Sequence, residues 1–125
     1  MKNTEYTLTI NGKTYPARYT LGTAIRAAER RGGDLSGMFG NKNQAEFISD
    51  MAWLAAEMIG AEAARREYET GEKAGELPTE EEILATVDFA DLLELQGQML
   101  TVINKDRPTV KAEVDEKNAE AAPGE

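Results

Sequence analysis

The sequence contains no cysteine and no histidine among its 125 residues. Without cysteine the chain has no disulfide, no thiolate nucleophile and no cysteine-ligated zinc or iron–sulfur site. Without histidine it lacks the commonest general base and the commonest metal ligand. The spacing of a glycine-rich phosphate loop or of a calcium-binding loop is missing as well. We therefore expect a protein that is not an enzyme and that has no cofactor, no catalytic residues and no metal site.

Long hydrophobic runs and an excess of positive charge are also missing. No segment approaches the roughly eighteen consecutive apolar residues of a membrane helix, and the start of the chain lacks the hydrophobic region of a signal peptide. The net charge is −9 and the pI about 4.6, so contact with the phosphates of nucleic acids or anionic lipids is unfavourable. These features predict a cytoplasmic protein with no nucleic-acid partner and no membrane partner.

The size and composition are those of a single folded domain. Hydrophobic residues make up 41% and charged residues 30% of the chain, which is enough apolar material for a core. We expect one α+β domain over residues 1–114 and a disordered polar tail over residues 115–125. Residues 109–114 alternate between polar and apolar side chains, and we leave open whether they form a third strand.

The pattern of residues 5–20 predicts a β-hairpin. Two alternating runs flank Asn11-Gly12, a pair that suits a two-residue type I′ turn because both turn positions need a positive φ. Such a turn pairs Leu8 with Tyr15, and Pro16, which has no N–H, indicates an edge position. One face of the hairpin then carries Tyr6, Leu8, Ile10, Tyr15, Ala17 and Tyr19.

Helical periodicity and capping residues predict about four helices on which the hairpin packs. They cover residues 21–31, 43–70, 79–87 and 89–104, and a short helical turn covers residues 35–39. The second and third helices begin with the spacing of a capping box, Asn43 with Glu46 and Thr79 with Glu82. In the first helix we expect four core-facing residues, namely Leu21, Ala24, Ile25 and Ala28.

The long helix over residues 43–70 carries an apolar stripe and the only tryptophan. The stripe consists of Phe47, Ile48, Met51, Leu54, Ala55, Met58 and Ile59. A helical wheel places Trp53 nearly opposite this stripe. Either the hairpin or the first helix covers the indole, or Trp53 is an exposed anchor for a partner. The candidate partner-binding residues are Trp53, Met51, Leu54, Met58, Tyr6 and Tyr19.

Charge is distributed unevenly along the chain. Residues 1–33 hold six cations and two anions, whereas residues 34–104 hold four cations and fifteen anions. The two segments could attract each other between copies of the chain, or their charges could meet within one molecule or on solvated faces. In the long helix, Glu62, Arg65, Arg66 and Glu69 have the spacing of ion pairs on a solvated end.

An ordered set of residues runs from the hairpin into the first helices. It consists of Asn11-Gly12-Lys13 at the turn, Arg18-Tyr19-Thr20 after the second strand, and then Gly22, Glu29 and Leu35. This pattern resembles the opening of the tail assembly chaperones of long-tailed bacteriophages and prophages. The later segments follow in the same order as in that family, so the resemblance covers residues 6–104.

The resemblance implies a protein that binds the tape measure protein, keeps its helices soluble and helps to recruit tail tube protein. It also implies self-association and a place in the cytoplasm of the bacterial host, with absence from the mature virion. In many members ribosomal frameshifting adds a longer form, and this chain would be the short form. The alternative is another phage component, such as a head–tail connector or minor tail protein. An enzyme or a nucleic-acid regulator is the third class.

Overall fold

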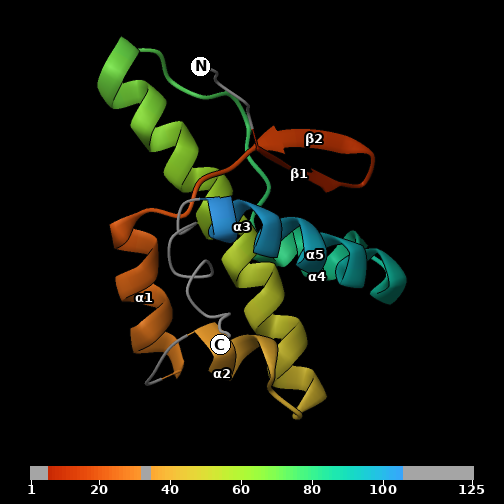
Figure 1. Cartoon of the computed structure of the whole chain (residues 1–125). Coiled ribbons are helices and arrows are strands. Elements are labelled where there is room, and N and C mark those ends of the chain that lie inside the picture. The colour runs from red at the N-terminus through yellow and green to blue at the C-terminus, as the bar shows by residue number, and fades with distance from the viewer. Residues whose placement is uncertain (1–5, 32–34, 106–125) are drawn as a thin grey trace, which may run out of the picture.

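The computed structural model describes residues 6–31 and 35–105, which form a two-stranded hairpin packed on helices (Figure 1). The predicted α+β class is thereby confirmed. Residues 109–114, for which a third strand was left open, and the expected tail at residues 115–125 lie outside the described residues. The elements are β1 (Thr7–Ile10), β2 (Lys13–Pro16), α1 (Leu21–Arg31), α2 (Leu35–Phe39), α3 (Gln44–Thr70), α4 (Glu80–Thr86) and α5 (Phe89–Lys105).

The hairpin has the predicted turn and register. Asn11 and Gly12 both have positive φ, 54° and 80°, as a type I′ turn requires. The strands are antiparallel and Leu8 pairs with Tyr15. The outer edge of β1 faces α5, where the backbone N–H of Thr9 donates to the side-chain carbonyl of Gln98 at 2.8 Å. On the β2 edge Pro16 removes a donor, so neither edge offers a full row of hydrogen-bonding groups.

Helix α3 begins and ends where its capping residues predict. The Asn43 side chain accepts a hydrogen bond from the backbone N–H of Glu46, and Gly71 ends the helix with φ 82°. The reciprocal half of the expected capping box is not formed, because the Asn43 N–H donates to the side chain of Asn41 instead. At α4 the predicted box is complete, with Thr79 and Glu82 each bonded to the other's backbone.

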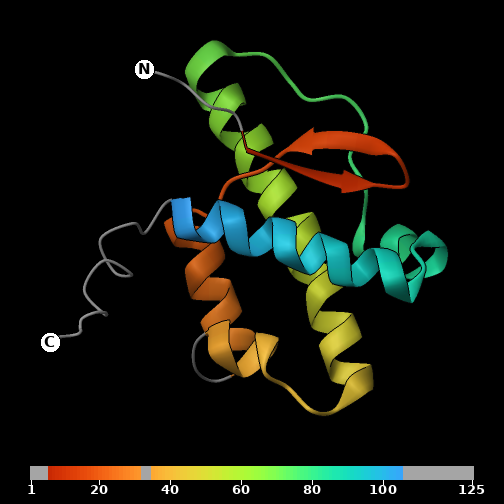
Figure 2. The ribbon, with the colours of Figure 1, turned by 45° about the vertical axis from the view of Figure 1, so that its right-hand side comes forward.

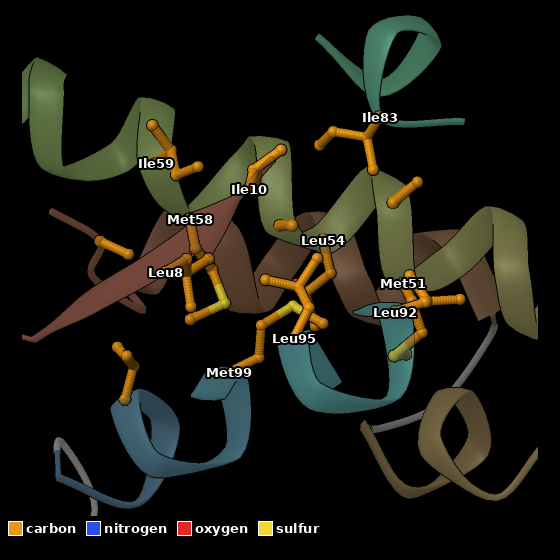
Figure 3. Close-up of a cluster of buried hydrophobic side chains, with 14 of the residues drawn as sticks. Leu8, Ile10, Met51, Leu54, Met58, Ile59, Ile83, Leu92, Leu95 and Met99 are labelled. Carbon is orange, nitrogen blue, oxygen red and sulfur yellow. The ribbon is translucent and has the colours of Figure 1, made fainter. Parts of the chain in front are cut away.

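The core lies between α3, α5 and β1. Figures 1 and 2 show α5 crossing α3, with the hairpin beside it and α1 and α2 on the other side. Figure 3 shows that side chains from both helices and from β1 and α4 converge. The larger side chains that are fully buried in the core are Leu8, Met38, Met51, Leu54, Met58, Ile59, Ile83, Leu95, Met99 and Val102. Apolar burial of this extent is the main source of the fold's stability.

The predicted core face of α1 is wrong. Leu21 and Ile25 are 86% and 59% exposed, whereas Thr23 and Ala27 are buried. Ala24 and Ala28 are half-buried, between the exposed and the buried face of the helix. The helix presents its small residues to α3 because the arginines on the same side bind acidic residues of α3, and this polar contact replaces the expected aliphatic one.

Candidate interaction surfaces

The part of the chain that the structure describes contains no cluster of metal-ligating side chains. Within residues 6–31 and 35–105, no three acidic side chains are arranged to hold a metal ion. Among the same residues no helix is both long and apolar enough to cross a membrane. The features that could carry function are ionic clusters, grooves and exposed apolar side chains on the helices.

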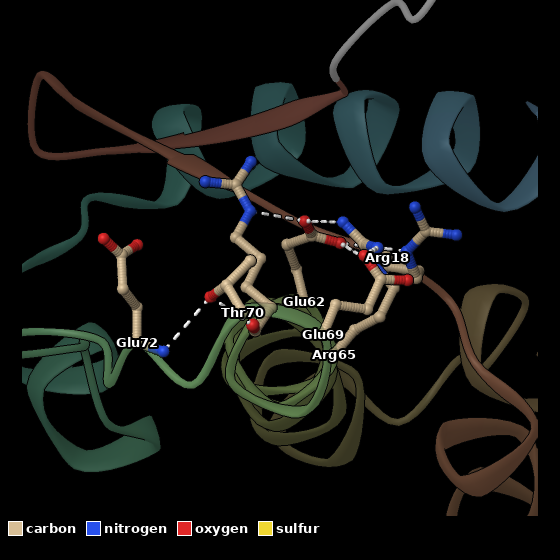
Figure 4. Close-up of polar contacts among 7 residues, drawn as sticks. Arg18, Glu62, Arg65, Glu69, Thr70 and Glu72 are labelled. Carbon is tan, nitrogen blue, oxygen red and sulfur yellow. Dashed lines mark hydrogen bonds and ion pairs between the residues drawn. The ribbon is translucent and has the colours of Figure 1, made fainter.

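One ionic cluster joins the segment after β2 to the second half of α3 (Figure 4). The carboxylate of Glu62 accepts hydrogen bonds from Arg18 Nε at 2.9 Å, from Arg65 Nη2 at 2.8 Å and from Arg66 Nε at 2.6 Å. Arg65 also binds Glu69. Glu62 is buried, so the solvated helix end expected from its spacing is wrong at this residue, which is held by an arginine distant in sequence.

Burial alone would raise the pKa of Glu62, because a buried carboxylate loses its hydration. The hydrogen bonds from Arg65, Arg18 and Arg66 outweigh that effect and lower the pKa to about 2. The bonds to Glu62 and Glu69 in turn raise the pKa of Arg65 above its ordinary value. Glu62 therefore stays ionised at neutral pH and acts as a structural anchor, not as a proton donor.

A second ionic cluster joins α1 to α3. Arg30 Nε donates to the buried Asp50 at 2.7 Å, and its Nη2 donates to Ser49 Oγ at 2.9 Å. The guanidinium lies 5.0 Å from the centroid of the Trp53 ring. Nearby, Arg26 binds Glu57 at 2.7 Å. Three arginines of the basic N-terminal segment, the two named here and Arg18, therefore bind acidic residues of the same molecule.

The structure does not bring the six candidate partner-binding residues together on one surface. Met51, Leu54 and Met58 are fully buried, which corrects their expected place on a partner surface, because the hairpin, α4 and α5 already cover the stripe of α3. Trp53 is half-buried beneath Arg30 of α1, one of the two covers expected for it. Tyr6 and Tyr19 are half-buried and pack against the core.

Exposed apolar side chains occur at positions that the sequence pattern assigns to helical core stripes. Leu21 and Ile25 are exposed on α1, Leu84 on α4, and three residues on α5, Phe89, Leu93 and Leu100. No local signal separates them from their buried neighbours, since exposed and buried apolar residues alternate within the same helices. Their exposure becomes visible only when the helices are packed.

A groove of about 500 Å³ lies between α1 and the second half of α3. Small residues of α3, Ala56, Gly60 and Ala64, line it, and the exposed Tyr68 stands at one end. A Cβ added at Gly60 would meet no atom within 4 Å, so the groove is open at its middle. This groove and the outer face of α5 are two separate candidate surfaces.

Comparison of the chain with protein-family models, with curated proteins and with solved structures finds no match.

Proposed function

We propose that this chain is a non-enzymatic tail assembly chaperone of a long-tailed phage or prophage, which binds helical segments of the tape measure protein. The proposal combines the resemblance of residues 6–104 with one structural observation. Large apolar side chains stand on the outer faces of α1, α4 and α5, while the core beneath them is already filled. Apolar helix faces of this kind suit amphipathic helices as partners.

The charge of the chain fits the same role. A long helical partner that awaits assembly exposes apolar stripes, which aggregate unless they are covered. A net charge of −9 on the covering protein keeps the resulting complex soluble through mutual repulsion between complexes. The recruitment of tail tube protein, a site of action in the bacterial cytoplasm and absence from the mature virion belong to the proposal through the resemblance.

Self-association is part of the proposal, and the structure favours some routes over others. A route through opposite charges is weakened, because Arg18, Arg26 and Arg30 bind acidic residues within the molecule. A route through the hairpin edge meets Gln98 on β1 and Pro16 on β2. We therefore expect apolar association that persists at high salt, and sedimentation velocity at low and high salt measures it. If high salt dissociates the oligomer, self-association through opposite charges would be favoured instead.

Coexpression tests the function directly. The tape measure protein encoded beside this chain is produced with and without it in the same host, and the soluble fraction is measured. We expect the tape measure protein to be soluble, and to copurify with the chain, only in the coexpressing cells. An insoluble tape measure protein in both cultures would contradict the proposal.

Analysis of purified phage particles separates the chaperone from a connector or minor tail protein. A chaperone is present in the infected cell and absent from the finished particle, whereas a structural component remains in a fixed ratio to the tail tube protein. Mass spectrometry of gradient-purified particles measures that ratio. A stoichiometric amount in the particles would favour the structural alternative.

A further inference from the structure

Helix α5 has a buried face and, directly beside it, an exposed apolar stripe. At about 100° per residue, Phe89, Leu93 and Leu100 fall within about 40° of one another along the helix. Their exposed fractions are 47%, 47% and 37%. We call these three residues the α5 stripe.

The α5 stripe is not needed to hold the helix in place. The adjacent face of α5 supplies five buried residues that pack towards α3 and β1, namely Leu92, Leu95, Met99, Val102 and Ile103. Gln98 adds the hydrogen bond to β1. Among the described residues, no side chain covers the stripe as completely as α3 and β1 cover these buried residues, so between 37% and 47% of each stripe residue faces solvent.

The part of the chain that carries the stripe is acidic. The sequence has no lysine or arginine between Lys73 and Lys105. Over the same part of the chain, α4, α5 and the link between them carry six carboxylates, Glu80, Glu81, Glu82, Asp88, Asp91 and Glu94. Five of the six are exposed. On the helical wheel Asp91 and Glu94 lie about 100° or more round α5 from the stripe, yet a helix is only about 10 Å wide, which is comparable with the screening length at physiological salt.

We propose that the α5 stripe docks a basic amphipathic helix of a partner protein. Its apolar face would cover Phe89, Leu93 and Leu100, and its lysines and arginines would be attracted by the negative potential of the acidic residues of α4 and α5. Opposite charges around an apolar contact raise the association rate and select the partner. The proposal rests on the function proposed above only where that partner is taken to be the tape measure protein.

A second copy of the chain is a poorer occupant than a basic helix. It carries a net charge of −9 and would meet an acidic surface. Its basic segment holds Arg18, Arg26 and Arg30 in internal ion pairs, so those charges are already neutralised. Repulsion between like-charged surfaces opposes this association.

Fluorescence anisotropy of a labelled peptide tests the docking. The probe is a helical peptide of about 20 residues with leucines on one face and lysines on the others. The control peptide has the same leucines, with glutamate in place of each lysine. We expect the full-length protein to bind the basic peptide at least about tenfold more tightly than the acidic one. Salt should weaken the binding of the basic peptide.

Matched variants assign the binding to the α5 stripe. Leu93→Gln with Leu100→Gln changes the stripe, and Leu21→Gln with Ile25→Gln makes the same change on α1. All four positions are exposed, so both variants should fold, and circular dichroism verifies it. We expect the α5 variant to lose at least about tenfold in affinity and the α1 variant less than about twofold. Equal losses in both, or no basic preference in the wild type, would overturn the proposal.

Photo-cross-linking identifies what covers the stripe. A benzoylphenylalanine in place of Leu93 in the full-length chain is irradiated with the basic peptide, and mass spectrometry locates the product. A cross-link to the peptide supports the proposal. A cross-link to a second copy, or to residues 106–125 of the same chain, gives the stripe another occupant and overturns it.

Coexpression with the tape measure protein then separates the two proposals. If that protein still copurifies with the Leu93→Gln, Leu100→Gln variant, the chaperone function stands and the α5 stripe is not its docking site. If the basic peptide binds the stripe but the tape measure protein is insoluble in every culture, the docking site stands and the chaperone function does not.

Discussion

The guanidinium of Arg30 lies over the indole ring of Trp53, 5.0 Å from its centroid. The same side chain donates to the buried Asp50 at 2.7 Å. One arginine of α1 thus covers the only tryptophan and neutralises a carboxylate that has no access to water. The attachment of α1 to α3 depends on this residue, because the aliphatic side chains of α1 point elsewhere.

Removal of Arg30 should therefore destabilise the fold strongly. We expect Arg30→Met to lower the free energy of unfolding by about 3 kcal/mol, since the buried Asp50 loses its charged partner. Arg26→Met is the control and should cost less than about 1 kcal/mol, because Arg26 is half-exposed and its partner Glu57 keeps contact with water. Urea denaturation measures both, and the emission of Trp53 should shift to longer wavelength only in the Arg30 variant. Equal losses would contradict this reading.

Glu62 should make the stability of the protein depend on pH in the acid range. Its pKa is about 2 in the folded protein, against about 4.3 for an unperturbed glutamate. A lowered folded pKa stabilises the fold above about pH 4.3, and this contribution is lost as the pH falls towards about 2. We expect the stability difference between wild type and Glu62→Gln to shrink by about 3 kcal/mol between about pH 6 and about pH 2.

Denaturation at a series of pH values measures that difference. Glu69→Gln is the matched control, because Glu69 binds the same Arg65 but its side chain is 55% exposed. Its stability relative to wild type should change little with pH. A difference for Glu62→Gln that stays constant from neutral to acid pH would mean that its carboxylate is not held by the arginines as the structure has it.

The two faces of α1 should respond oppositely to substitution. Ala27→Leu places a larger side chain in a filled contact with α3 and should cost about 1–3 kcal/mol. Ile25→Gln changes a solvated position and should stay within about 0.5 kcal/mol of wild type. Thermal denaturation of the two variants decides which face is buried. A costly Ile25→Gln with a harmless Ala27→Leu would restore the face expected from the sequence.

Two glycines, one inside α3 and one at its C-terminal cap, should also respond oppositely to alanine. Gly71 ends the helix at φ 82°, where a side chain is strained, so Gly71→Ala should cost about 1 kcal/mol. Gly60 lies inside the helix and an added Cβ meets nothing within 4 Å. Gly60→Ala should stabilise the protein by about 0.5–1 kcal/mol. Chemical denaturation measures both changes, and loss of stability in both variants would show that Gly60 has a packing role.

Much of the fold could be read from local chemistry. Asn11-Gly12 specifies a turn whose register determines which hairpin residues face the core. Asn43 and Gly71 mark the two ends of α3, and Thr79 marks the start of α4. These features were predictable because each depends on the φ angles and hydrogen bonds of a few consecutive residues.

The candidate surfaces were not predictable in the same way. The pattern of α1 favoured burial of Leu21 and Ile25, but arginine contacts with α3 turned the small residues inward. The spacing of Glu62 with Arg65 indicated a solvated pair, but Arg18, distant in sequence, helps to bury it. On α5 the apolar residues outnumber those that α3 and β1 can cover, so the stripe of Leu93 and Leu100 stays outside.

By itself, then, the sequence determined the hairpin, the helix boundaries, the acidic charge and the absence of cysteine and histidine chemistry. Only the tertiary structure decided that Trp53 lies beneath Arg30, that Met51 and Met58 belong to the core, and which side of α5 meets solvent. The physical reason is that a turn or a helix cap depends only on the φ angles and hydrogen bonds of a few consecutive residues. Which face of an apolar helix is buried depends instead on the area and charge that its neighbours present.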